Sequence, residues 1–433
     1  MNVLLLGSGG REHALALALA RSPLLRSLTI APGNPGTAAV GRNVAVAIDD
    51  PAAVVSLARE IGCDLVVVGP EAPLVAGVAD ALAAAGIRVF GPSRAAAALE
   101  GSKGFTKDLC RAEGIPTAAY ACFDAPDPAN AFLASHRLPV VIKADGLAAG
   151  KGVVIATTLE EAREAVTAMF DGAFGQAGAS VVIEEFLDGE ELSFFALCDG
   201  TRAVSFGSAQ DHKRVGEGDT GPNTGGMGAI SPAPAFDAAL ERAILDRMVH
   251  PTLHGMAARG TPFTGMLFAG LMVGPDGPQL IEYNVRLGDP EAEVLLPRLD
   301  EDLLPLLDAA ARGALQPRPV RFKDDTVALA VVMAARGYPG PPVKGTRIEG
   351  LEAAAALPGV TVHHAGTRQD GEVLLADGGR VLAITGMGAT AAEARARAYA
   401  GVDAIVWPEG FCRRDIGTRA IARNAASESG DAA

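Results

Sequence analysis

Short apolar runs, each closed by a glycine- or proline-containing turn, dominate the first hundred residues. Val3–Leu6 precedes the helix-forming stretch Arg11–Arg21, and Leu65–Val68 and Arg88–Phe90 repeat the strand-and-turn pattern. Strands that alternate with helices form parallel sheets with helices on both faces. We therefore expect a doubly wound α/β domain over residues 1–100, with ligands at the edge where the strands end.

The middle of the chain, residues 101–315, has more lysines and fewer strand–helix repeats. Pro139–Lys143, Gly152–Ala156 and Ser180–Glu184 predict strands, and Leu159–Asp171 predicts a helix between the last two. Further on, a Gly-Pro-Asp-Gly turn separates two apolar runs and predicts a hairpin. Those two runs are Met266–Val273 and Gln279–Val285.

The last part of the chain predicts a small α+β domain over residues 322–423. The Pro- and Arg-rich stretch Gln316–Arg321 predicts the linker before it, and residues 424–433 predict a disordered tail. The strand-like stretches of this part are Thr326–Met333, Gly371–Leu375 and Arg380–Thr385.

Length and charge narrow the classes of function. At roughly 150 residues per domain, 433 residues suggest about three domains. Lys and Arg number 37 against 51 Asp and Glu, and the net charge of −14 argues against nucleic-acid and anionic-membrane partners. Five scattered cysteines predict reduced thiols, and the N-terminus lacks a signal-peptide pattern. We expect a cytoplasmic protein.

The first glycine-rich turn, Gly7-Ser8-Gly9-Gly10-Arg11-Glu12-His13, resembles a dinucleotide fingerprint. Glu12 stands where that fingerprint needs its third glycine, which disfavours NAD. Backbone N–H groups at a helix start still suit a single phosphate. The turn therefore predicts a phosphate-binding loop, and a plain tight turn is the alternative.

A second loop, Asp145–Gly152, carries a Gly-Lys pair between two predicted strands. It departs from the P-loop pattern because Asp145 replaces the first glycine and Gly152 replaces the hydroxyl residue. A glycine-rich loop with a lysine can still fold over nucleotide phosphates as a flap. A structural hairpin is the alternative.

Three polar residues, Glu282, Asn284 and Arg286, alternate along a predicted strand and therefore project from one face. Carboxylate and amide oxygens are hard ligands that suit Mg²⁺, with nucleotide phosphates completing the coordination. Arg286 beside them can stabilise charge on a transferring phosphoryl group. The charged turn Gly288-Asp289-Pro290-Glu291 disfavours the alternative of a solvated polar face.

Two further stretches are candidates for nucleotide contact. Ile183–Glu191 begins as a strand and breaks at Asp188-Gly189, an end that can offer backbone groups to adenine and a carboxylate to ribose. Asp211–Gly228 predicts a long glycine-rich polar loop, and such loops are functional or disordered. We expect His212 in this loop to be an ordinary surface histidine and not a catalytic residue.

Together these motifs resemble the ATP-grasp superfamily and, within it, the glycinamide ribonucleotide synthetase family. The resemblance runs from residue 1 to about residue 420. The strings that carry it are GSGGREHA (7–14), APGNPGT (31–37), VGPEAPL (68–74), EGSK (100–103), KADGLAAGKG (143–152), QDHKR (210–214), GPNTGGMGA (221–229) and RLGDPE (286–291).

The resemblance implies a two-lobed ATP-grasp region, with its smaller lobe at about 120–190, between the N- and C-terminal domains. It also implies roles for individual residues. The implied ATP-binding residues are Lys103, Lys143, Gly150, Lys151, Glu184, Glu185, Phe186, Leu187 and Glu191. The implied phosphoribosylamine-binding residues are Gly9, Gly10, Arg11, Glu12, Asn34 and Glu71. Arg286, Asp289 and Lys213 would be catalytic, and Glu282 and Asn284 would hold the metal.

The implied reaction joins glycine to 5-phosphoribosylamine with ATP, through glycyl phosphate, in de novo purine synthesis. The implied cofactor is Mg²⁺ or Mn²⁺. Many superfamily members also carry an acid on the preceding strand, whereas Met266–Val273 has none, so the number of ions, one or two, stays open. The oligomeric state is open between a monomer and a weak dimer.

Three other functions compete with this one. An NAD-dependent dehydrogenase needs the missing third glycine. An ATP-grasp carboxylase or transformylase would share Glu282 and Asn284 but lack the strings at 210–214 and 221–229. A non-enzymatic nucleotide-binding protein would show no glycine-dependent release of ADP.

Overall fold

The N-terminal part of the computed structural model contains the predicted parallel sheet, in the strand order β3-β2-β1-β4-β5. Side chains of β1 alternate between two cores: Leu4 and Leu6 pack on one face, and Val3 and Leu5 on the other. Helices on both faces are what a doubly wound domain requires, and that prediction is confirmed. The strands are β1 (Asn2–Gly7), β2 (Ser27–Pro32), β3 (Arg42–Asn43), β4 (Leu65–Val68) and β5 (Arg88–Phe90). The helices are α1 (Gly10–Ala20), η1 (Thr37–Ala39), α2 (Pro51–Glu60), α3 (Glu71–Ala76) and α4 (Val78–Ala84).

Residues 1–147, 152–173 and 175–423 are the part of the chain that the structure describes. The predicted ATP-binding residues Gly150 and Lys151 lie outside these ranges, as does the predicted tail at 424–433. Among the described residues, none of the helices has the length and apolarity needed to cross a membrane.

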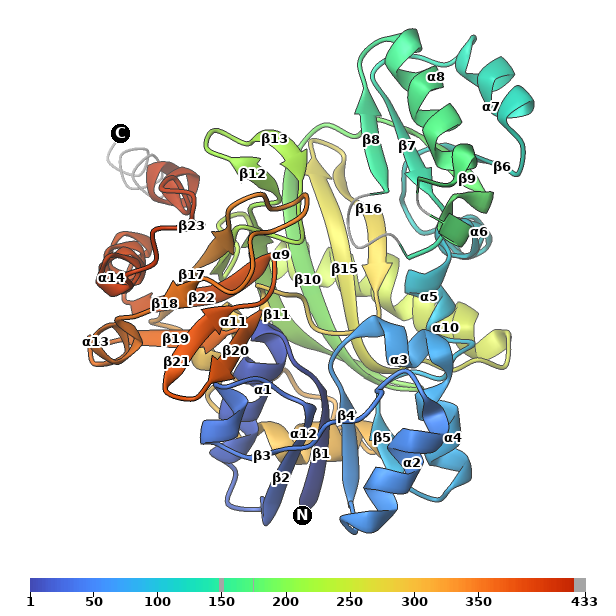
Figure 1. Cartoon of the computed structure of the whole chain (residues 1–433). Coiled ribbons are helices and arrows are strands. Elements are labelled where there is room, and N and C mark those ends of the chain that lie inside the picture. The colour runs from blue at the N-terminus through green and yellow to red at the C-terminus, as the bar shows by residue number, and fades with distance from the viewer. Residues whose placement is uncertain (148–151, 174, 424–433) are drawn as a thin grey trace, which may run out of the picture.

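A small antiparallel sheet, in the order β6-β9-β7-β8, stands apart from the rest at the upper right of Figure 1. Thr158 caps the N-terminus of α8 with its side chain. The predicted helix Leu159–Asp171 is α-helical to Ala168 and continues as a π-helical turn, in which Gly172 has a non-helical φ of 89°. The elements are β6 (Tyr120–Phe123), α7 (Pro126–Leu133), β7 (Val140–Ala144), β8 (Val153–Ala156), α8 (Leu159–Ala168), η2 (Met169–Ala173), η3 (Gly175–Ala179) and β9 (Val181–Glu185).

A nine-stranded sheet forms the centre of the molecule, and it continues from the middle of the chain into the last hundred residues. Its strands follow the order β16-β15-β10-β11-β14-β17-β22-β19, and β23 pairs with β17. The predicted hairpin is confirmed as β15–β16, in which Gly274 pairs with Gly277. The strands are β10 (Glu190–Asp199), β11 (Ala203–Asp211), β14 (Gly228–Ser231), β15 (Thr264–Gly274), β16 (Gly277–Asn284), β17 (Val327–Ala335), β19 (Val360–His364), β22 (Arg380–Gly388) and β23 (Gly410–Phe411).

The stretch Asp211–Gly228 is not the single long loop that the sequence predicted. It contains a two-stranded hairpin, β12 (Arg214–Gly216) and β13 (Thr220–Asn223), which pairs with no other strand of the described part of the chain.

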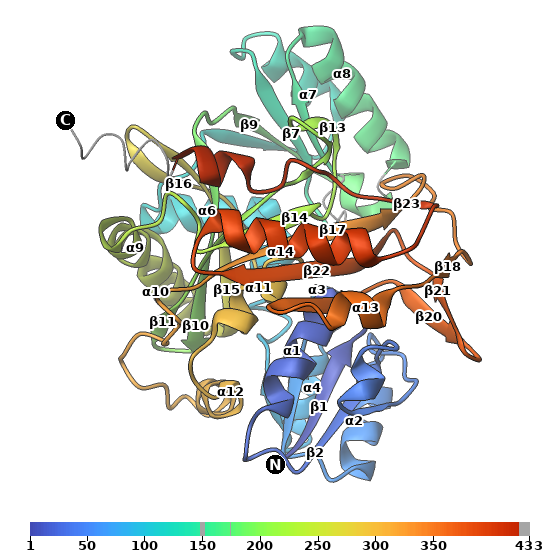
Figure 2. The same cartoon turned by 90° about the vertical axis from the view of Figure 1, so that its left-hand side faces the viewer.

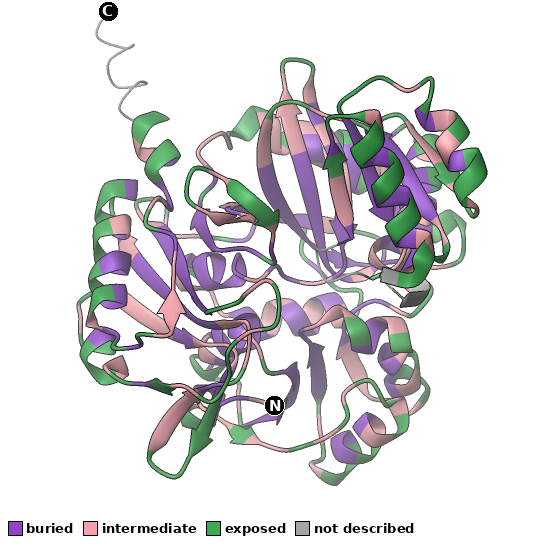
Figure 3. Ribbon diagram, turned by 45° about the horizontal axis from the view of Figure 1, so that its top comes forward, coloured by how far each residue is buried: buried purple, intermediate pink, exposed green. Residues whose placement is uncertain are grey.

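The last part of the chain surrounds its share of the large sheet with α14 and a small three-stranded sheet, β18-β21-β20 (Figure 2). Figure 3 shows that the strands are mostly buried, whereas the helices on the outside of the molecule expose one face to solvent. The remaining elements of this part are β18 (Arg347–Ile348), α13 (Leu351–Ala355), β20 (Thr367–Asp370), β21 (Val373–Ala376) and α14 (Ala391–Ala404). The helices of the middle part are α5 (Ala98–Gly101), α6 (Lys103–Glu113), α9 (Ala238–Ile244), η4 (Leu245–Val249), α10 (His250–Ala258), α11 (Ala292–Arg298) and α12 (Leu303–Ala311).

Candidate functional site

One cleft of about 1060 Å³ is lined by residues from the N-terminal, middle and C-terminal parts of the chain. Its lining includes Arg11 of α1, Lys143 of β7, Glu282 of β16 and Arg380 of β22. These residues are far apart in the sequence, and the meeting of the small sheet, the large sheet and α1 brings them together. A cleft of this size between domains is typical of a small-molecule site.

A buried carboxylate holds two lysines at one wall of the cleft. Glu184 Oε2 accepts from Lys143 Nζ at 2.9 Å and lies 3.0 Å from Lys107 Nζ. Lys107 also donates to the Thr117 hydroxyl at 2.7 Å. Lys103, on the same helix as Lys107, donates to the Gly146 carbonyl at 3.1 Å. The predicted phosphate-binding lysines are therefore together, and Glu184 faces them.

Sequence reasoning missed Lys107, which is 2% exposed and lines the same cleft. Burial lowers its pKa, although Glu184 opposes that shift. Its spacing of four residues after Lys103 on a helix was the available signal, since residues four apart share a face.

The chain leaves the small sheet after Glu185, and Phe186 and Leu187 then line the cleft outside any strand. Backbone groups there are free of the sheet ladder, which is what contact with an adenine edge requires. Glu191, in β10, lies across the cleft and pairs with Lys213.

The candidate metal ligands lie together at the end of β16. Glu282 and Asn284 both line the cleft, and Asn284 Oδ1 accepts from Arg286 Nη2 at 3.1 Å. Burial alone would raise the pKa of Glu282, but Lys213 and Lys143 outweigh burial and lower it. Glu282 is therefore ionised at neutral pH.

These donors fit a hard divalent cation bound together with a nucleotide. Across the described ranges, no group of three or more His, Cys, Asp or Glu side chains gathers as a metal site. A carboxylate and an amide oxygen supply part of an octahedral shell, and substrate phosphates are the usual source of further ligands for Mg²⁺.

Arg286 is held by two acids from the N-terminal side of the cleft. Its guanidinium lies 2.8 Å from Glu100 Oε1 and 3.3 Å from Glu71 Oε2. Glu100 was not among the predicted residues, although it lies within the string EGSK. The two carboxylates orient Arg286 toward the cleft beside Asn284.

Two backbone N–H groups of the first glycine-rich turn already donate to carboxylates of the protein itself. The Gly9 N–H donates to Glu12 Oε2 at 2.6 Å, and the Arg11 N–H donates to Asp289 Oδ2 at 3.3 Å. A Cβ at Gly10 would lie 2.3 Å from Glu293 Oε1, so a larger residue there would displace this buried carboxylate of α11. Carboxylates therefore already occupy two of the N–H groups that were predicted to receive a phosphate.

Asp289 and Asn34 connect the N-terminal part to the C-terminal part. Asp289 Oδ1 lies 3.0 Å from Arg380 Nη2, a partner that sequence reasoning missed. The Asn34 amide donates to the carbonyls of Ser8 and His364, each at 2.8 Å. Asn34 does not line the cleft, and its side chain joins two parts of the fold.

The expectation that His212 is an ordinary surface histidine is wrong. His212 is 8% exposed, and its Nδ1 lies 3.2 Å from the Gly228 carbonyl. Burial, together with the nearby Arg413, lowers its pKa to about 4. The neutral ring is therefore the form present at neutral pH.

Comparison with known proteins decides the family. Models of the phosphoribosylglycinamide synthetase N domain, ATP-grasp (A) domain and C domain match residues 1–100, 101–292 and 328–419. The chain belongs to the phosphoribosylglycinamide synthetase family. The family resemblance and the fold class predicted from the sequence are both confirmed.

Relatives of this family are similar along the whole chain. The phosphoribosylamine–glycine ligase of Mesorhizobium japonicum is 60% identical over 427 residues, which is 99% of this chain and 100% of the relative. The Brucella melitensis ligase is 58% identical with the same coverage. The crystal structure of the Thermotoga maritima ligase matches with a TM-score of 0.85 at 34% identity, covering 96% of this chain and 100% of that one. Biotin carboxylase from Campylobacter jejuni, at 13% identity and a TM-score of 0.71, shares the fold.

Proposed function

We propose that this protein joins glycine to 5-phosphoribosylamine at the expense of ATP, giving glycinamide ribonucleotide, ADP and phosphate in de novo purine synthesis. The observation that carries the proposal is one cleft in which Lys103, Lys143, Glu282, Asn284 and Arg286 meet. Membership of a family of carbon–nitrogen ligases with an ATP-grasp domain supports it.

The first step transfers a phosphoryl group. A glycine carboxylate oxygen attacks the γ-phosphorus of ATP, the bond to ADP breaks, and glycyl phosphate forms. Lys103, Lys143 and Arg286 neutralise the phosphate charges that this step redistributes, and the cleft holds the reactants in line.

The second step forms the amide bond. The amine of phosphoribosylamine attacks the acyl carbon, phosphate leaves with one former carboxylate oxygen, and the nitrogen loses a proton. No protein nucleophile is needed, and among the described residues that line the cleft there is neither Ser nor Cys.

Glu282 and Asn284 are assigned to Mg²⁺ or Mn²⁺, which supplies charge neutralisation on the ATP phosphates when bound. Lys213 and Asp289 act beside Arg286. Glu184–Leu187 and Glu191 hold the nucleotide.

The residues assigned to phosphoribosylamine are Gly9, Gly10, Arg11, Glu12, Asn34 and Glu71. In this proposal the domains span 1–100, 101–315 and 322–423, and the enzyme works in the cytoplasm on small molecules, as a monomer or a weak dimer.

An isotope experiment tests the acyl phosphate. Glycine labelled with heavy oxygen in its carboxylate should deliver one labelled oxygen to the released phosphate. Unlabelled phosphate beside a labelled amide product would show that glycine was never phosphorylated. ADP release over many turnovers should also require both glycine and phosphoribosylamine, because the amine must consume glycyl phosphate before the next cycle, and omission of each in turn is the matching control.

A further inference from the structure

Lys213 lies at the base of the β12–β13 hairpin. The two-stranded sheet of this hairpin is too small to fix the position of the hairpin by itself. It contains two short strands and, within residues 1–147, 152–173 and 175–423, pairs with no other strand. Isolated two-stranded hairpins are marginally stable in water. At its tip Asp219 adopts a φ of 55°, a left-handed conformation that costs free energy for any residue except glycine. Contacts from elsewhere must therefore fix it.

Those contacts come from one segment near the end of the chain, residues 413–419, in which the exposed Arg419 also pairs with Asp219. Arg413 Nη1 lies 2.8 Å from Asp219 Oδ1 and donates to the Arg214 carbonyl at 2.9 Å. The Gly218 N–H donates to Asp415 Oδ2 at 2.8 Å, and the Arg414 N–H donates to Glu217 Oε1 at 3.0 Å.

Arg413 is at the centre of this network, and its guanidinium group contacts both the hairpin and Asp415. Its side chain is 2% exposed, and Asp415 accepts from Nε at 2.8 Å and from Nη2 at 2.7 Å. A guanidinium held by two parallel hydrogen bonds has a defined direction. Arg413 therefore presents Nη1 to the hairpin at one orientation.

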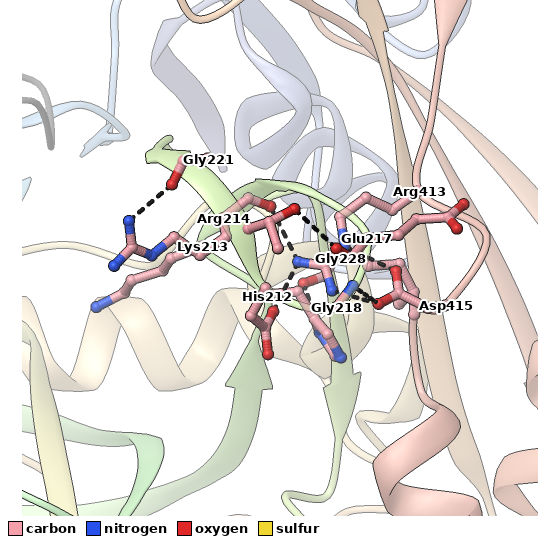
Figure 4. A network of polar contacts seen from close by, with 12 residues as sticks. His212, Lys213, Arg214, Glu217, Gly218, Gly221, Gly228, Arg413 and Asp415 are labelled. Atoms are coloured by element: carbon pink, nitrogen blue, oxygen red, sulfur yellow. Dashed lines mark hydrogen bonds and ion pairs between the residues drawn. The ribbon is translucent and has the colours of Figure 1, made fainter.

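The same segment also contacts the residue before Lys213. The Gly417 N–H donates to His212 Nε2 at 3.4 Å, while His212 Nδ1 faces the Gly228 carbonyl. Figure 4 shows that Arg413 and Asp415 lie on one side of this backbone and that the Lys213 side chain extends away from them on the other. There Lys213 pairs with Glu191 and lies 4.0 Å from Glu282.

We infer that Arg413 is a positioning residue for the nucleotide site, acting through the β12–β13 hairpin on Lys213. The inference rests on the proposed function for what the cleft binds. The inference gives the C-terminal part of the chain a role in catalysis, because this part determines the position of the Lys213 ammonium group beside Glu282 and Glu191. Arg413 itself touches no substrate in this assignment.

The test compares Arg413→Met, which keeps the bulk of the side chain and removes its donors, with Val402→Ala. Val402 is 3% exposed in the core of the C-terminal part and has no polar contact with the hairpin. Trp407, the single tryptophan of the chain, is buried nearby and reports by fluorescence whether this part is folded.

We expect Arg413→Met to weaken binding of a nonhydrolysable ATP analogue and to raise KM for ATP, each about tenfold or more, with KM for phosphoribosylamine within about twofold. Val402→Ala should lower the melting temperature and leave all KM values at wild type. Wild-type ATP binding in folded Arg413→Met, or an equal loss in Val402→Ala, would overturn the inference.

Two further variants keep the test decisive. Asp415→Asn is isosteric and partly exposed, so it should fold, and it should shift KM for ATP in the same direction. In a Lys213→Met background, Arg413→Met should add no further loss of analogue binding, because both act through one group. Additive losses would show that Arg413 acts elsewhere. Since analogue binding needs no ligation, absence of glycine ligation in the wild type would refute the proposed function alone.

Discussion

Glu282→Gln separates the role of a metal ligand from that of an ordinary charge in the cleft. The substitution removes one negative charge and keeps the size of the side chain. Glu282 lies 4.0 Å from Lys213 Nζ, and Lys143, Lys103 and Arg286 also attract it strongly enough to lower its pKa against the effect of burial. In the variant, the four cationic side chains just named therefore have one negative charge fewer beside them.

Without a divalent cation, this change should tighten ATP binding. A unit pair at 4.0 Å is worth about 4 kcal/mol at an effective dielectric constant of about 20. The side chains of Lys213 and Glu282 are 28% and 33% exposed, and solvent screening reduces the value to about 1 kcal/mol. Phosphates compete with Glu282 for Lys213, so removal of that competition corresponds to up to about fivefold in the dissociation constant for ATP.

With Mg²⁺ present the sign should reverse. The variant replaces the anionic carboxylate ligand with a neutral amide oxygen, which binds a divalent cation more weakly, and charge stabilisation by a metal is worth several kcal/mol in the transition state. A loss of about 3 kcal/mol lowers kcat more than a hundredfold.

Calorimetry of ATP binding with and without Mg²⁺, followed by steady-state kinetics, measures both effects. Glu190→Gln is the matched control, because Glu190 lines the same cleft and is not an assigned ligand; its ratio of metal-free to metal-loaded affinity should equal that of the wild type. If Glu282→Gln changed both affinities by the same factor, Glu282 would not be a metal ligand.

Three other substitutions test further parts of the site and the fold. Lys143→Ala should weaken ATP binding about 10- to 100-fold, as expected for one charged hydrogen bond, and phosphoribosylamine binding much less; equal losses by calorimetry would remove Lys143 from the nucleotide site. Arg11→Ala should raise KM for phosphoribosylamine, and tight NAD binding by the wild type would refute that assignment of the first glycine-rich turn. Burial lowers the pKa of His363 from 6.5 to about 4, so below pH 6.5 only the unfolded state gains this proton and stability falls as pH drops toward 4. His363→Leu should flatten denaturant-measured stability over that range by up to about 1.4 kcal/mol per pH unit, and an unchanged slope would contradict the assignment.

Local patterns were sufficient for elements whose ends are marked in the sequence. Leu65–Val68 and Arg88–Phe90 were predicted with the bounds that β4 and β5 have. Both are short runs with apolar residues at their ends toward Gly69 and Gly91, and the physical cause of each boundary lies within a few residues of it. The hairpin β15–β16 and the shared face of Glu282 and Asn284 follow from the same kind of local rule.

A strand whose apolar run does not alternate could not be recognised in this way, even where Gly189 and Gly200 bound it. β10 (Glu190–Asp199) is buried on both faces because β11 and β15 flank it within a sheet that helices cover. Its apolar run has no alternation to mark it, and the partners that make it a strand lie elsewhere in the chain.

The sequence by itself determined the fold class, the family and the kinds of side chain that a phosphate and a hard cation require. Only the tertiary structure decided which of these side chains meet and what holds them. Lys107 lies at the same wall of the cleft as Lys143 because Glu184 pairs with both lysines. His212 is buried where Gly417, 205 positions away in the sequence, donates its N–H to the ring. Contacts at that separation leave no periodic trace in the sequence, since the burial and charge of each residue depend on a neighbour that only the folded chain supplies.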